Sequence, residues 1–512
     1  MAAQPYTIKS LPGIKRDGTR FENGFYVDGQ WCRFQRGLPR KMWGYRRMSN
    51  QMPEISRGMN GYNQDGTLHL VSGGQSYLTQ FEINSTGVVT GIFDRTPSGF
   101  VPDANHLWSF DVNFDSVGVA QGAYLFAHPG KNLSQIDSTD TSQMYWGLVN
   151  GTTDLTVNTA PAVSGGVVSL YPYVFVYGSD GYVAWSVPNS PNDWLSIGSG
   201  DGYVTSQKIV AALPLRAGPG NAPAGLFWSL DSLIRCTFVG GDTVFQFDTI
   251  TSQTSILSAQ SPIEYDGIFY WCGVDRFLQF NGVVREIPNQ LNQNWFYDNL
   301  NYEQRQKVFA YKVPRFGEIW WCYPRGNATE CTHAVVYNVR ENTWYDTELP
   351  NSGRSSGKFV TVYQYPITAG IDPTDGFYKL WQMEYGLDEV DGTQINSIPS
   401  YIQTADISAV ADPSNPKNRA LRCTYIEPDF VQNGVMTCQI IGRANARSPD
   451  VTSPEHEFVA LQDIETPEQQ IVFFKETRRE MRFIFKSNTV GGDFQMGQCI
   501  AHIETSDGTI LG

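Results

Sequence analysis

Apolar and polar positions alternate in short runs along most of the chain, and helical periodicity is almost absent. Runs of β-branched and aromatic residues stop at Gly, Asn, Asp or Pro, as strands bounded by turns do. One segment, 289–306, spaces Leu291, Trp295 and Leu300 as they would lie on one side of a helix. The pattern therefore predicts an all-β protein with a single helical segment.

A loose repeat runs through the middle of the chain, at residues 68–92, 124–148, 173–197, 234–257, 268–287 and 335–349. Each unit is an apolar strand, a tight polar turn, a second strand carrying an aromatic residue, and a link to a third strand. The pairs Gly73-Gly74, Asp180-Gly181 and Gly240-Gly241 supply the positive φ that two-residue hairpin turns require.

The spacing of these units, about 53 residues, is close to the ~40–50 residues of a four-stranded β-propeller blade. Stacked blades would cover each other with aromatic side chains, so the aromatic content of 13% needs no binding site. We expect a propeller of about six blades, or seven, because residues 308–381 have room for one blade and part of another. The alternative is several β-sandwiches in series.

The end of the chain has a different pattern. Residues 411–416, ADPSNP, are linker-like, and the strands after them are longer. Alternation in MRFIFK (481–486) and FQMGQCIAHIE (494–504) predicts a two-sheet sandwich with one buried face per strand. We therefore divide the chain into a basic N-terminal segment with the first strands (1–50), a β-propeller (51–410) and a C-terminal β-sandwich (415–512).

Charge is unevenly distributed. The net charge is −14, yet residues 1–50 hold ten Lys or Arg against three Asp or Glu, a balance of +7 that leaves −21 for the rest. The overall sign speaks against a general nucleic-acid coat that works by neutralising phosphates. A basic end on an acidic body indicates that the end meets a different partner from the body.

Targeting and redox signals are few. No window approaches the ~18 apolar residues of a transmembrane helix, and the first residues do not have the pattern of a cleaved signal peptide. The eight cysteines include no C-x-x-C pair and mostly occupy apolar runs such as IFYWCG, which speaks against disulfides or zinc. We expect no membrane span and synthesis in a reducing cytosol.

Catalytic signatures are missing from the sequence. There is no H-E-x-x-H, G-x-S-x-G, phosphate-binding glycine loop or calcium loop, and no two histidines are close. Glycoside hydrolysis needs two carboxylates about 5–10 Å apart. Asp115, Asp231 and Asp266 neighbour aromatic residues but are better explained as turn residues. We expect no catalytic residues, no cofactor and no metal.

The segment 27–48, VDGQWCRFQRGLPRKMWGYRRM, interleaves basic and aromatic residues. Such a mixture can bind phosphates while stacking on bases, or dock onto an acidic protein surface. The alternative is an edge strand whose arginines face water and whose aromatics face the core. The candidate residues for contact with an adaptor or a neighbouring subunit are Arg33, Arg36, Arg40, Lys41, Arg46 and Arg47.

Several segments resemble tail proteins of double-stranded DNA bacteriophages. FYVDGQWCRFQRGLPRKMWGYRR (25–47) resembles their opening, and YVAWSVPNSPNDWLSI (182–197) resembles one of their propeller hairpins. EIWWCYP (318–324), HAVVYNVRENTWYDTEL (333–349) and SNTVGGDFQMGQCIAHIETSDG (487–508) add to the likeness. Together they resemble tail nozzle or tail-hub proteins of short-tailed phages, which include packaged-DNA stabilisation and tail tubular B proteins.

This resemblance implies a non-catalytic virion tail protein, made in the host cytoplasm, with a β-propeller and added β-domains. It implies a homohexameric ring beneath the portal and adaptor, contacts with tailspike or needle proteins, and transient passage of double-stranded DNA during ejection. The basic N-terminal segment would suit an acidic adaptor, and an acidic body would let DNA slide. The alternatives are a tail-associated propeller glycosidase or depolymerase, and a fibre or spike that adheres to host glycan.

Overall fold

The computed structural model describes residues 3–19, 24–49, 51–64, 66–117, 121–130, 141–215, 222–361, 363–408, 420–445 and 447–506. Strands dominate, so the prediction of an all-β chain is confirmed. The predicted helical segment contains α1 (Gln293–Asn299) and the 3₁₀ turn η3 (Tyr302–Lys307), with extended backbone at Leu300 between them. The other described helical turns are η1 (Ser179–Gly181), η5 (Leu461–Asp463) and η6 (Pro467–Gln470).

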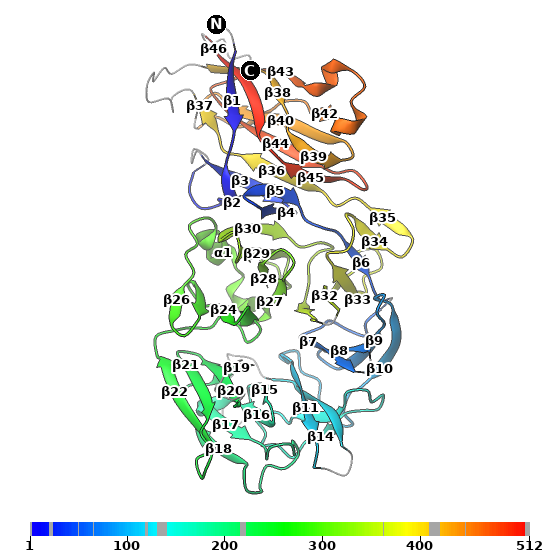
Figure 1. The fold of residues 1–512 in the computed structure, drawn as a ribbon, viewed down its shortest axis with the longest axis vertical. Helices are drawn as coiled ribbons and strands as arrows, with labels where there is room; N and C mark the ends of the chain where they lie inside the picture. The colour runs from blue at the N-terminus through cyan, green and yellow to red at the C-terminus, as the bar shows by residue number, and fades with distance from the viewer. Residues whose placement is uncertain are drawn as a thin grey trace.

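Seven sheets follow one another along the chain between residues 59 and 383, and we call them serial sheets 1 to 7 (Figure 1). Sheets 1 to 3 contain β7 (Met59–Gln64), β8 (Thr67–Gly73), β9 (Leu78–Ile83), β10 (Val89–Asp94); β11 (Ser109–Asp115), β12 (Gly122–His128), β13 (Tyr145–Leu148), β14 (Thr156–Val157); and β15 (Gly166–Leu170), β16 (Tyr173–Tyr177), β17 (Tyr182–Trp185), β18 (Gly200–Tyr203). Sheets 4 to 6 contain β19 (Ile209–Pro214), β20 (Ala224–Ser229), β21 (Leu233–Phe238), β22 (Phe245–Thr251); β23 (Ile263–Tyr265), β24 (Ile268–Cys272), β25 (Phe277–Phe280), β26 (Val284–Glu286); and β27 (Phe309–Val313), β28 (Glu318–Tyr323), β29 (His333–Asn338), β30 (Thr343–Glu348).

Sheet 7 is completed by a strand from the other end of the sequence. β31 (Ser356–Phe359), β32 (Pro366–Ile371) and β33 (Tyr378–Met383) are consecutive, but the next strand in the sheet is β6 (Tyr45–Arg47). β6 pairs with β33 through Met383 opposite Tyr45 and Trp381 opposite Arg47. β34 (Glu389–Asp391) and β35 (Gln394–Asn396) extend the same sheet. The "part of another" blade expected near residue 381 is thus a sheet that borrows a strand from the N-terminus.

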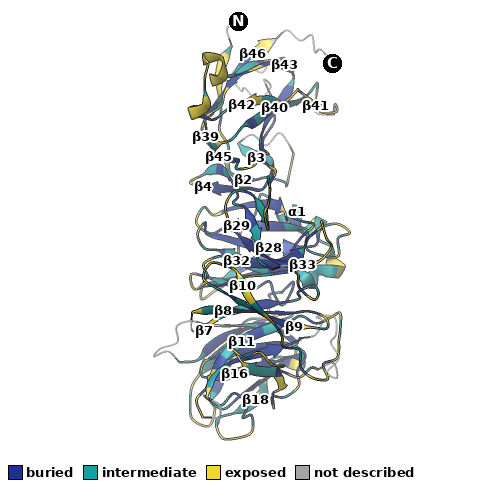
Figure 2. Cartoon of the chain, turned by 90° about the vertical axis from the view of Figure 1, so that its right-hand side faces the viewer, coloured by how far each residue is buried: buried dark blue, intermediate teal, exposed yellow. Residues whose placement is uncertain are grey.

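Apolar clusters link the serial sheets pairwise in a cycle. Sheets 1 and 2 share a cluster, as do 2 and 3, 3 and 4, 4 and 5, 5 and 6, and 6 and 7. A further cluster joins sheet 7 back to sheet 1, through Ile367 and Leu380 against Leu70 and Phe81. Aromatic pairs recur in these clusters, such as Trp228 against Trp271 with ring centroids 5.7 Å apart. Figure 2 shows buried residues through the middle of the sheets.

Three further sheets, which we call the terminal sheets, are built from both ends of the chain (Figure 1). From the N-terminus come β1 (Gln4–Ile8), β2 (Leu11–Ile14), β3 (Phe25–Gln30), β4 (Cys32–Gln35) and β5 (Leu38–Lys41). The remaining strands are β36 (Ser400–Thr404), β37 (Ile407–Ser408), β38 (Ala420–Glu427), β39 (Phe430–Asn433), β40 (Met436–Arg443), β41 (Val451–Thr452), β42 (His456–Phe458), β43 (Val472–Arg478), β44 (Glu480–Ser487), β45 (Asp493–Met496) and β46 (Cys499–Ser506).

The strand pairing in these sheets joins the N-terminal and C-terminal segments, which we predicted to be separate parts of the chain. β1 pairs with β46, β3 with β36, and β5 with β45. Residues 1–50 and 415–512 therefore contribute strands to the same sheets, and residues 400–404, placed with the serial sheets by pattern, lie between them. The linker-like residues 411–416 fall outside the described part of the chain.

Two of the three pairs have the expected positive φ, but the loops that carry them, residues 178–181 and 239–244, are longer than the predicted two-residue turns. Asp180 and Gly181 have φ of +56° and +69°, and Gly240 and Gly241 have φ of +73° and +72°. Gly73 and Gly74 do not have positive φ, so the predicted turn there is wrong. A Cβ on Gly73 would lie 2.3 Å from the Trp108 ring, and one on Gly74 would lie 2.4 Å from the Glu54 carboxylate. These glycines are required for close packing instead.

The expectation of one exposed face per C-terminal strand fails for MRFIFK. β44 is buried along almost its whole length, because β36 and β37 pair with one of its edges and β40 with the other, and a core cluster covers the face that carries Met481, Phe483 and Phe485. The charge of Arg482, a polar residue within this strand, is paired with two aspartates of the same chain: Arg482 lies 3.0 Å from Asp406 and 2.6 Å from Asp450. The alternation there reflects a buried ion pair, while β40 does alternate between buried and half-buried positions.

Candidate functional site

The six basic residues predicted as an interface are placed very differently from one another. Arg33 and Lys41 are fully buried, so they do not fit the expected surface contact. Arg40 lies 3.7 Å from Asp493, Arg47 lies 2.8 Å from Asp391, and Arg46 stacks over the Tyr385 ring at 4.3 Å. Arg36 is exposed.

Arg33 forms the centre of a buried ion cluster that we call the junction, with Glu318 and Glu384. Its two terminal nitrogens donate to the Glu384 carboxylate at 2.8 and 2.5 Å, and Nε lies 2.9 Å from Glu318. Glu318 also accepts hydrogen bonds from Tyr345 (2.7 Å) and Trp320 (2.9 Å). Burial disfavours the charged guanidinium, but the two carboxylates outweigh it and raise the pKa of Arg33.

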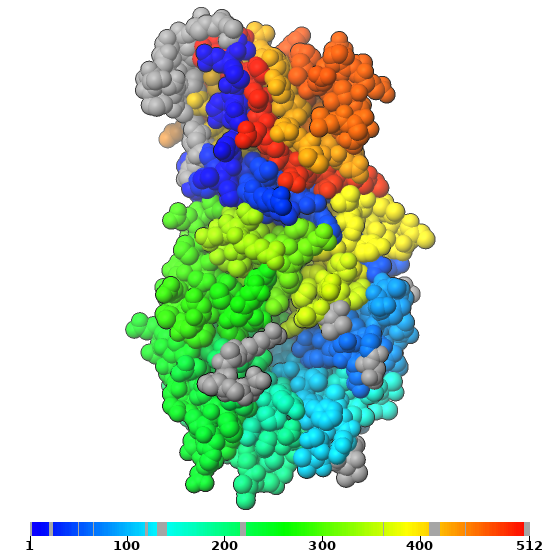
Figure 3. All heavy atoms as spheres, viewed as in Figure 1, coloured from blue at the N-terminus to red at the C-terminus, as the bar shows by residue number. Residues whose placement is uncertain are grey.

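The junction ties three parts of the chain together. Arg33 lies on β4 of a terminal sheet, Glu318 begins β28 of serial sheet 6, and Glu384 follows β33 of serial sheet 7. Glu384 adopts a left-handed φ of +61°, an unfavourable conformation that its paired carboxylate helps to hold. Figure 3 shows the blue N-terminal residues wedged between the green residues of the serial sheets and the red C-terminal residues.

A second contact repeats this arrangement. Arg16 donates to Asp346 on β30 at 3.0 Å and to Asp28 on β3 at 2.5 Å. The backbone amide of Arg36 donates to Glu341 at 2.7 Å. The acidic partner of the basic N-terminal segment is therefore, in large part, the acidic body of the same chain.

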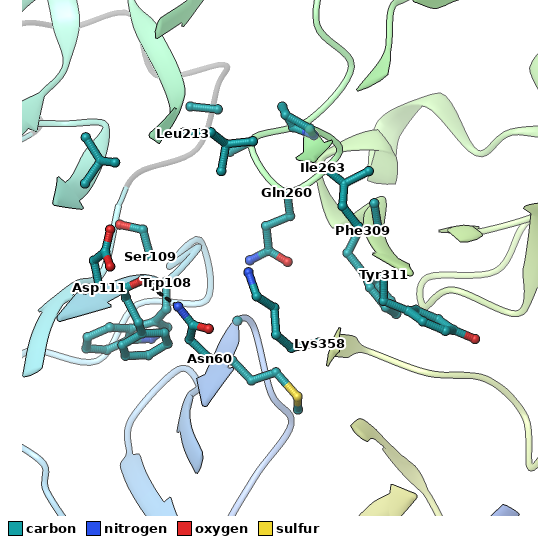
Figure 4. A pocket seen from close by; sticks show the side chains of 18 of the residues that line it. Asn60, Trp108, Ser109, Asp111, Leu213, Gln260, Ile263, Phe309, Tyr311 and Lys358 are labelled. Carbon is teal, nitrogen blue, oxygen red and sulfur yellow. Dashed lines mark hydrogen bonds between the residues drawn. The ribbon is translucent and has the colours of Figure 1, made fainter. Parts of the chain in front are cut away.

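A cavity of about 360 Å³ lies at the centre of the serial sheets. All seven sheets contribute to its wall through their first strands or the residues next to them, for example Asn60, Ser109 and Phe309 (Figure 4). First strands of neighbouring sheets touch, including β31 against β7. This volume falls in the range of about 300–1,000 Å³ typical of small-molecule sites.

The charged residues of the cavity wall are Asp111, Glu264, Lys312 and Lys358. Lys312 Nζ donates to the Glu264 carbonyl at 2.8 Å and approaches its carboxylate at 3.3 Å, so this pair is internally satisfied. Asp111 accepts backbone N–H groups from Val112 at 2.8 Å and Ser169 at 2.7 Å. Within the described residues, Lys358 makes no hydrogen bond or ion pair.

Burial shifts both remaining charges toward their neutral forms. It raises the pKa of Asp111 to about 6, although the two backbone N–H groups and Lys358 pull it down. Burial lowers the pKa of Lys358, against the attraction of Asp111 and together with the repulsion of Lys312. The cavity therefore holds a carboxyl group that titrates near neutral pH beside an ammonium group without a direct partner.

No local pattern in the sequence predicts this cavity, because its residues come from seven separate sheets. Of the aspartates considered for glycoside hydrolysis, Asp231 and Asp266 lie in turns as expected, where Asp231 accepts the Ser229 hydroxyl and Asp266 has a φ of +50°. The prediction is wrong for Asp115, which is the last residue of β11 and accepts the Val117 amide. Among the described residues, no three His, Cys, Asp or Glu side chains come together as a metal site. All eight cysteines are buried and unpaired.

Comparison with known proteins identifies no family: no family model and no curated protein sequence matches the chain. Solved structures with partial likeness include the designed Ika8 protein (TM-score 0.36, 10% identity, covering 73% of this chain and 100% of that one). A 6-phosphogluconolactonase candidate from Bacteroides uniformis has a TM-score of 0.39 and 12% identity, covering 62% of this chain and 95% of that one. An exported-protein candidate from Bacteroides fragilis has a TM-score of 0.31 and 10% identity, covering 66% and 93%. These likenesses are too weak to support a statement about this chain.

Over the described ranges, no helix combines the length and the apolar character that crossing a bilayer requires.

Proposed function

We propose that the chain is a structural subunit of the tail nozzle or hub ring of a short-tailed bacteriophage, without catalytic activity. In this proposal the serial sheets are the blades of a seven-bladed β-propeller, and the terminal sheets form a β-sandwich domain shared by both ends of the chain. The subunit assembles as a homohexamer in the virion tail, beneath portal and adaptor and beside spike or needle proteins. It retains packaged DNA and conducts it during ejection.

The observation that carries the proposal is the way the N-terminal segment fastens the two groups of sheets. β1 to β5 lie in the terminal sheets, β6 lies in serial sheet 7, and Arg33 between them joins both groups through buried carboxylates. Such a bridge resists bending, because any hinge motion would expose unpaired charges. A subunit that transmits load along a tail axis requires that stiffness.

The propeller interpretation is supported by the cycle of apolar clusters and by β6. A sheet completed by a strand from the far end of the chain prevents the cycle from opening between its first and last members. In this proposal the propeller has seven blades, the higher of the two counts expected from the sequence, because β6 completes a seventh sheet.

Candidate ring contacts lie in the segment that resembles a phage propeller hairpin. Leu195 and Ile197 are 97% and 102% exposed. The loop carrying them is held in place, since Trp194 donates to Asn158 at 3.0 Å and Asp193 accepts the amides of Leu195 and Ser196. Fixed, exposed aliphatic side chains are typical of contact surfaces. In a ring, this loop would face a different patch on the neighbouring subunit.

The central cavity sets a limit on how DNA would pass. Double-stranded DNA cannot enter a cavity of this size, because its major groove alone is about 12 Å wide. In our proposal the DNA channel is therefore the opening of the ring between six subunits. The exposed Arg36, together with Arg40, Arg46 and Arg47, remains the candidate adaptor contact.

Electron microscopy of the purified full-length chain, and of virions carrying an affinity-tagged copy, tests this proposal. We expect a six-fold ring on the tail axis. Replacing Leu195 and Ile197 by serine should reduce ring formation, whereas Val431→Ser, at a residue 76% exposed on β39, serves as the matched control. A chain that stays monomeric at high concentration and is absent from virions would overturn the proposal. Peripheral trimers would instead support a fibre or spike.

A tail-associated glycosidase or depolymerase is the second candidate, favoured only by the two carboxylates, Asp111 and Glu264, in the cavity wall. Release of sugar from host polysaccharide, abolished in Asp111→Asn and Glu264→Gln, would support it. The ion pair of Glu264 with Lys312 argues against a free second carboxylate.

A further inference from the structure

The cavity at the centre of the serial sheets holds polar groups that the proposed assembly role does not use. Lys358 extends from β31 into the space, and Gln260 points toward it from the opposite side (Figure 4). Asp111 and Ser109 lie on another part of the wall, on β11. Leu213, Ile263 and Phe309 supply apolar surface between them.

Most polar groups of the wall are already satisfied by the protein, which isolates Lys358. Asn60 donates to the Phe110 carbonyl at 2.9 Å, and Gln260 donates to the Arg57 carbonyl at 2.7 Å. Lys312 is held by Glu264. Lys358 makes no such contact with the described residues, although water reaches it through the cavity. An ammonium group that lines a cavity and has no paired carboxylate can bind the anionic group of a ligand.

Asp111 provides a second, different anchor. Two backbone amides fix its carboxyl group, so its orientation does not depend on a ligand. A carboxyl group accepts a hydrogen bond from a hydroxyl group whether or not it is ionised. A ligand that reaches both anchors therefore needs an anionic group for Lys358 and a hydroxyl group for Asp111, together with an apolar part that packs against the rest of the wall.

We propose that this cavity binds a small hydroxycarboxylic acid, with its carboxylate on Lys358 and its hydroxyl group on Asp111. A carboxylate fits better than a larger polyanion, because the wall carries one unpaired positive charge and Asp111 would repel additional negative charge. The cavity, about 360 Å³, has room for roughly a dozen water molecules, or for a ligand with one aromatic ring.

The proposal also predicts a pH dependence. Near pH 7.5 Asp111 is ionised and repels the bound carboxylate, but with a pKa of about 6 it is largely neutral at pH 5. A ligand carboxyl group with a pKa of about 3.5 stays ionised over this range. The other titratable groups that face Asp111 are Lys358, Tyr62 and Tyr177; burial lowers the pKa of Lys358 and raises the pKa of both tyrosines further above the usual value. Binding should therefore tighten as the pH falls.

Isothermal titration calorimetry on the full-length chain, with three related probes, tests the proposal. Mandelate carries both groups, phenylacetate lacks the hydroxyl group, and mandelamide lacks the charge. We expect mandelate to bind at least about threefold more tightly than either of the others, and about threefold more tightly at pH 5 than at pH 7.5. Failure of all three probes to bind at about 10 mM would overturn the proposal.

Variants separate the two anchors. Lys358→Met should weaken mandelate binding about tenfold or more, while Lys475→Met, at an exposed lysine on β43, should leave it unchanged. Asp111→Asn keeps an acceptor oxygen but cannot ionise, so it should remove the pH dependence alone, whereas Asp111→Leu should also remove the preference for mandelate over phenylacetate. Thermal unfolding of each variant confirms folding before titration. Equal mandelate affinity in folded Lys358→Met would overturn the assignment, and none of these outcomes depends on ring assembly.

Discussion

The junction and the central cavity both place charged groups inside the fold, but the junction buries them in ion pairs, whereas the cavity leaves Lys358 exposed and Asp111 half-buried. At the junction, Arg33 lies within hydrogen-bonding distance of two carboxylates, which in turn accept hydrogen bonds from neighbouring side chains. In the cavity, Lys358 meets only the longer-range attraction of Asp111. A matched buried charge fastens structure, and an unmatched one destabilises the folded state unless something binds it.

The comparison teaches that burial of a basic residue does not by itself reveal its role. Arg33 belongs to a run of basic residues that we predicted to form a surface contact. In the structure it is buried and forms ion pairs with Glu318 and Glu384. Lys358 stands in the unremarkable stretch SSGKF and has the exposed environment of a binding group. The number and distance of the carboxylates around each one make the difference.

Removal of residues 1–47 should have the largest effect. It deletes β1 to β6, leaving β46, β36 and β33 with unpaired edges and Glu318 and Glu384 without their arginine. We expect no cooperative unfolding transition by circular dichroism, against a control that lacks only residues 1–3. A folded truncated chain would mean that the N-terminal strands are dispensable. Adaptor contact should therefore be tested with point variants, not with this deletion.

Arg33→Met should destabilise the chain by about 3–5 kcal/mol, because it leaves two buried carboxylates without a counter-charge. Urea unfolding at pH 7.5 measures the effect, and Arg36→Met, at an exposed position of the same hairpin, is the matched control. Adding Glu318→Gln and Glu384→Gln should recover part of the loss. A midpoint equal to that of the wild type would contradict the fastening role.

Asp111→Asn should change the pH dependence of stability. Its pKa is raised to about 6 in the folded state, so the folded chain binds this proton more readily than the unfolded chain. Its contribution to stability therefore grows as the pH falls from above 6 toward 4, by about 1–2 kcal/mol after allowance for water in the cavity. Urea midpoints at pH 7.5 and 5 should differ less in the variant than in the wild type. Asp266→Asn, at an exposed turn, should keep the wild-type slope.

Lys358→Met should have the smallest effect and the opposite sign to Arg33→Met. Because no carboxylate pairs with Lys358 directly, removal of its charge should raise stability slightly, by at most about 1 kcal/mol given its contact with water. Thermal unfolding without ligand measures the change, with Lys475→Met as control. A loss of several kcal/mol would show that the cavity fastens structure as the junction does.

Local pattern could predict the strands and part of the turns. Each repeat segment falls on later strands of a serial sheet, as YVFVYGSDGYVAW (173–185) falls on β16 and β17. Asp180-Gly181 has the expected positive φ because its backbone demand is local. The seventh sheet was less visible, since its fourth strand is β6, and pairing between residues 47 and 381 leaves no trace in a local window.

The candidate site was beyond local pattern for the same reason. Asp111 and Lys358 belong to sheets 2 and 7, and neither is flanked by a motif. The difference in charge between the N-terminal segment and the body did indicate a contact between a basic and an acidic surface. We predicted the acidic surface to belong to another protein. Charge alone does not reveal whether complementary surfaces belong to one chain or two; the ion pairs of Arg16 and Arg33 do.

The strand β6 also constrains how this protein is made. Its partner β33 is synthesised on the order of 20 seconds to a minute after it, at about 5–20 residues per second. The partner of β1 is β46, which is synthesised later still. A chain that ends before β33 cannot complete serial sheet 7, and a chain that ends before β46 leaves β1 without its partner strand.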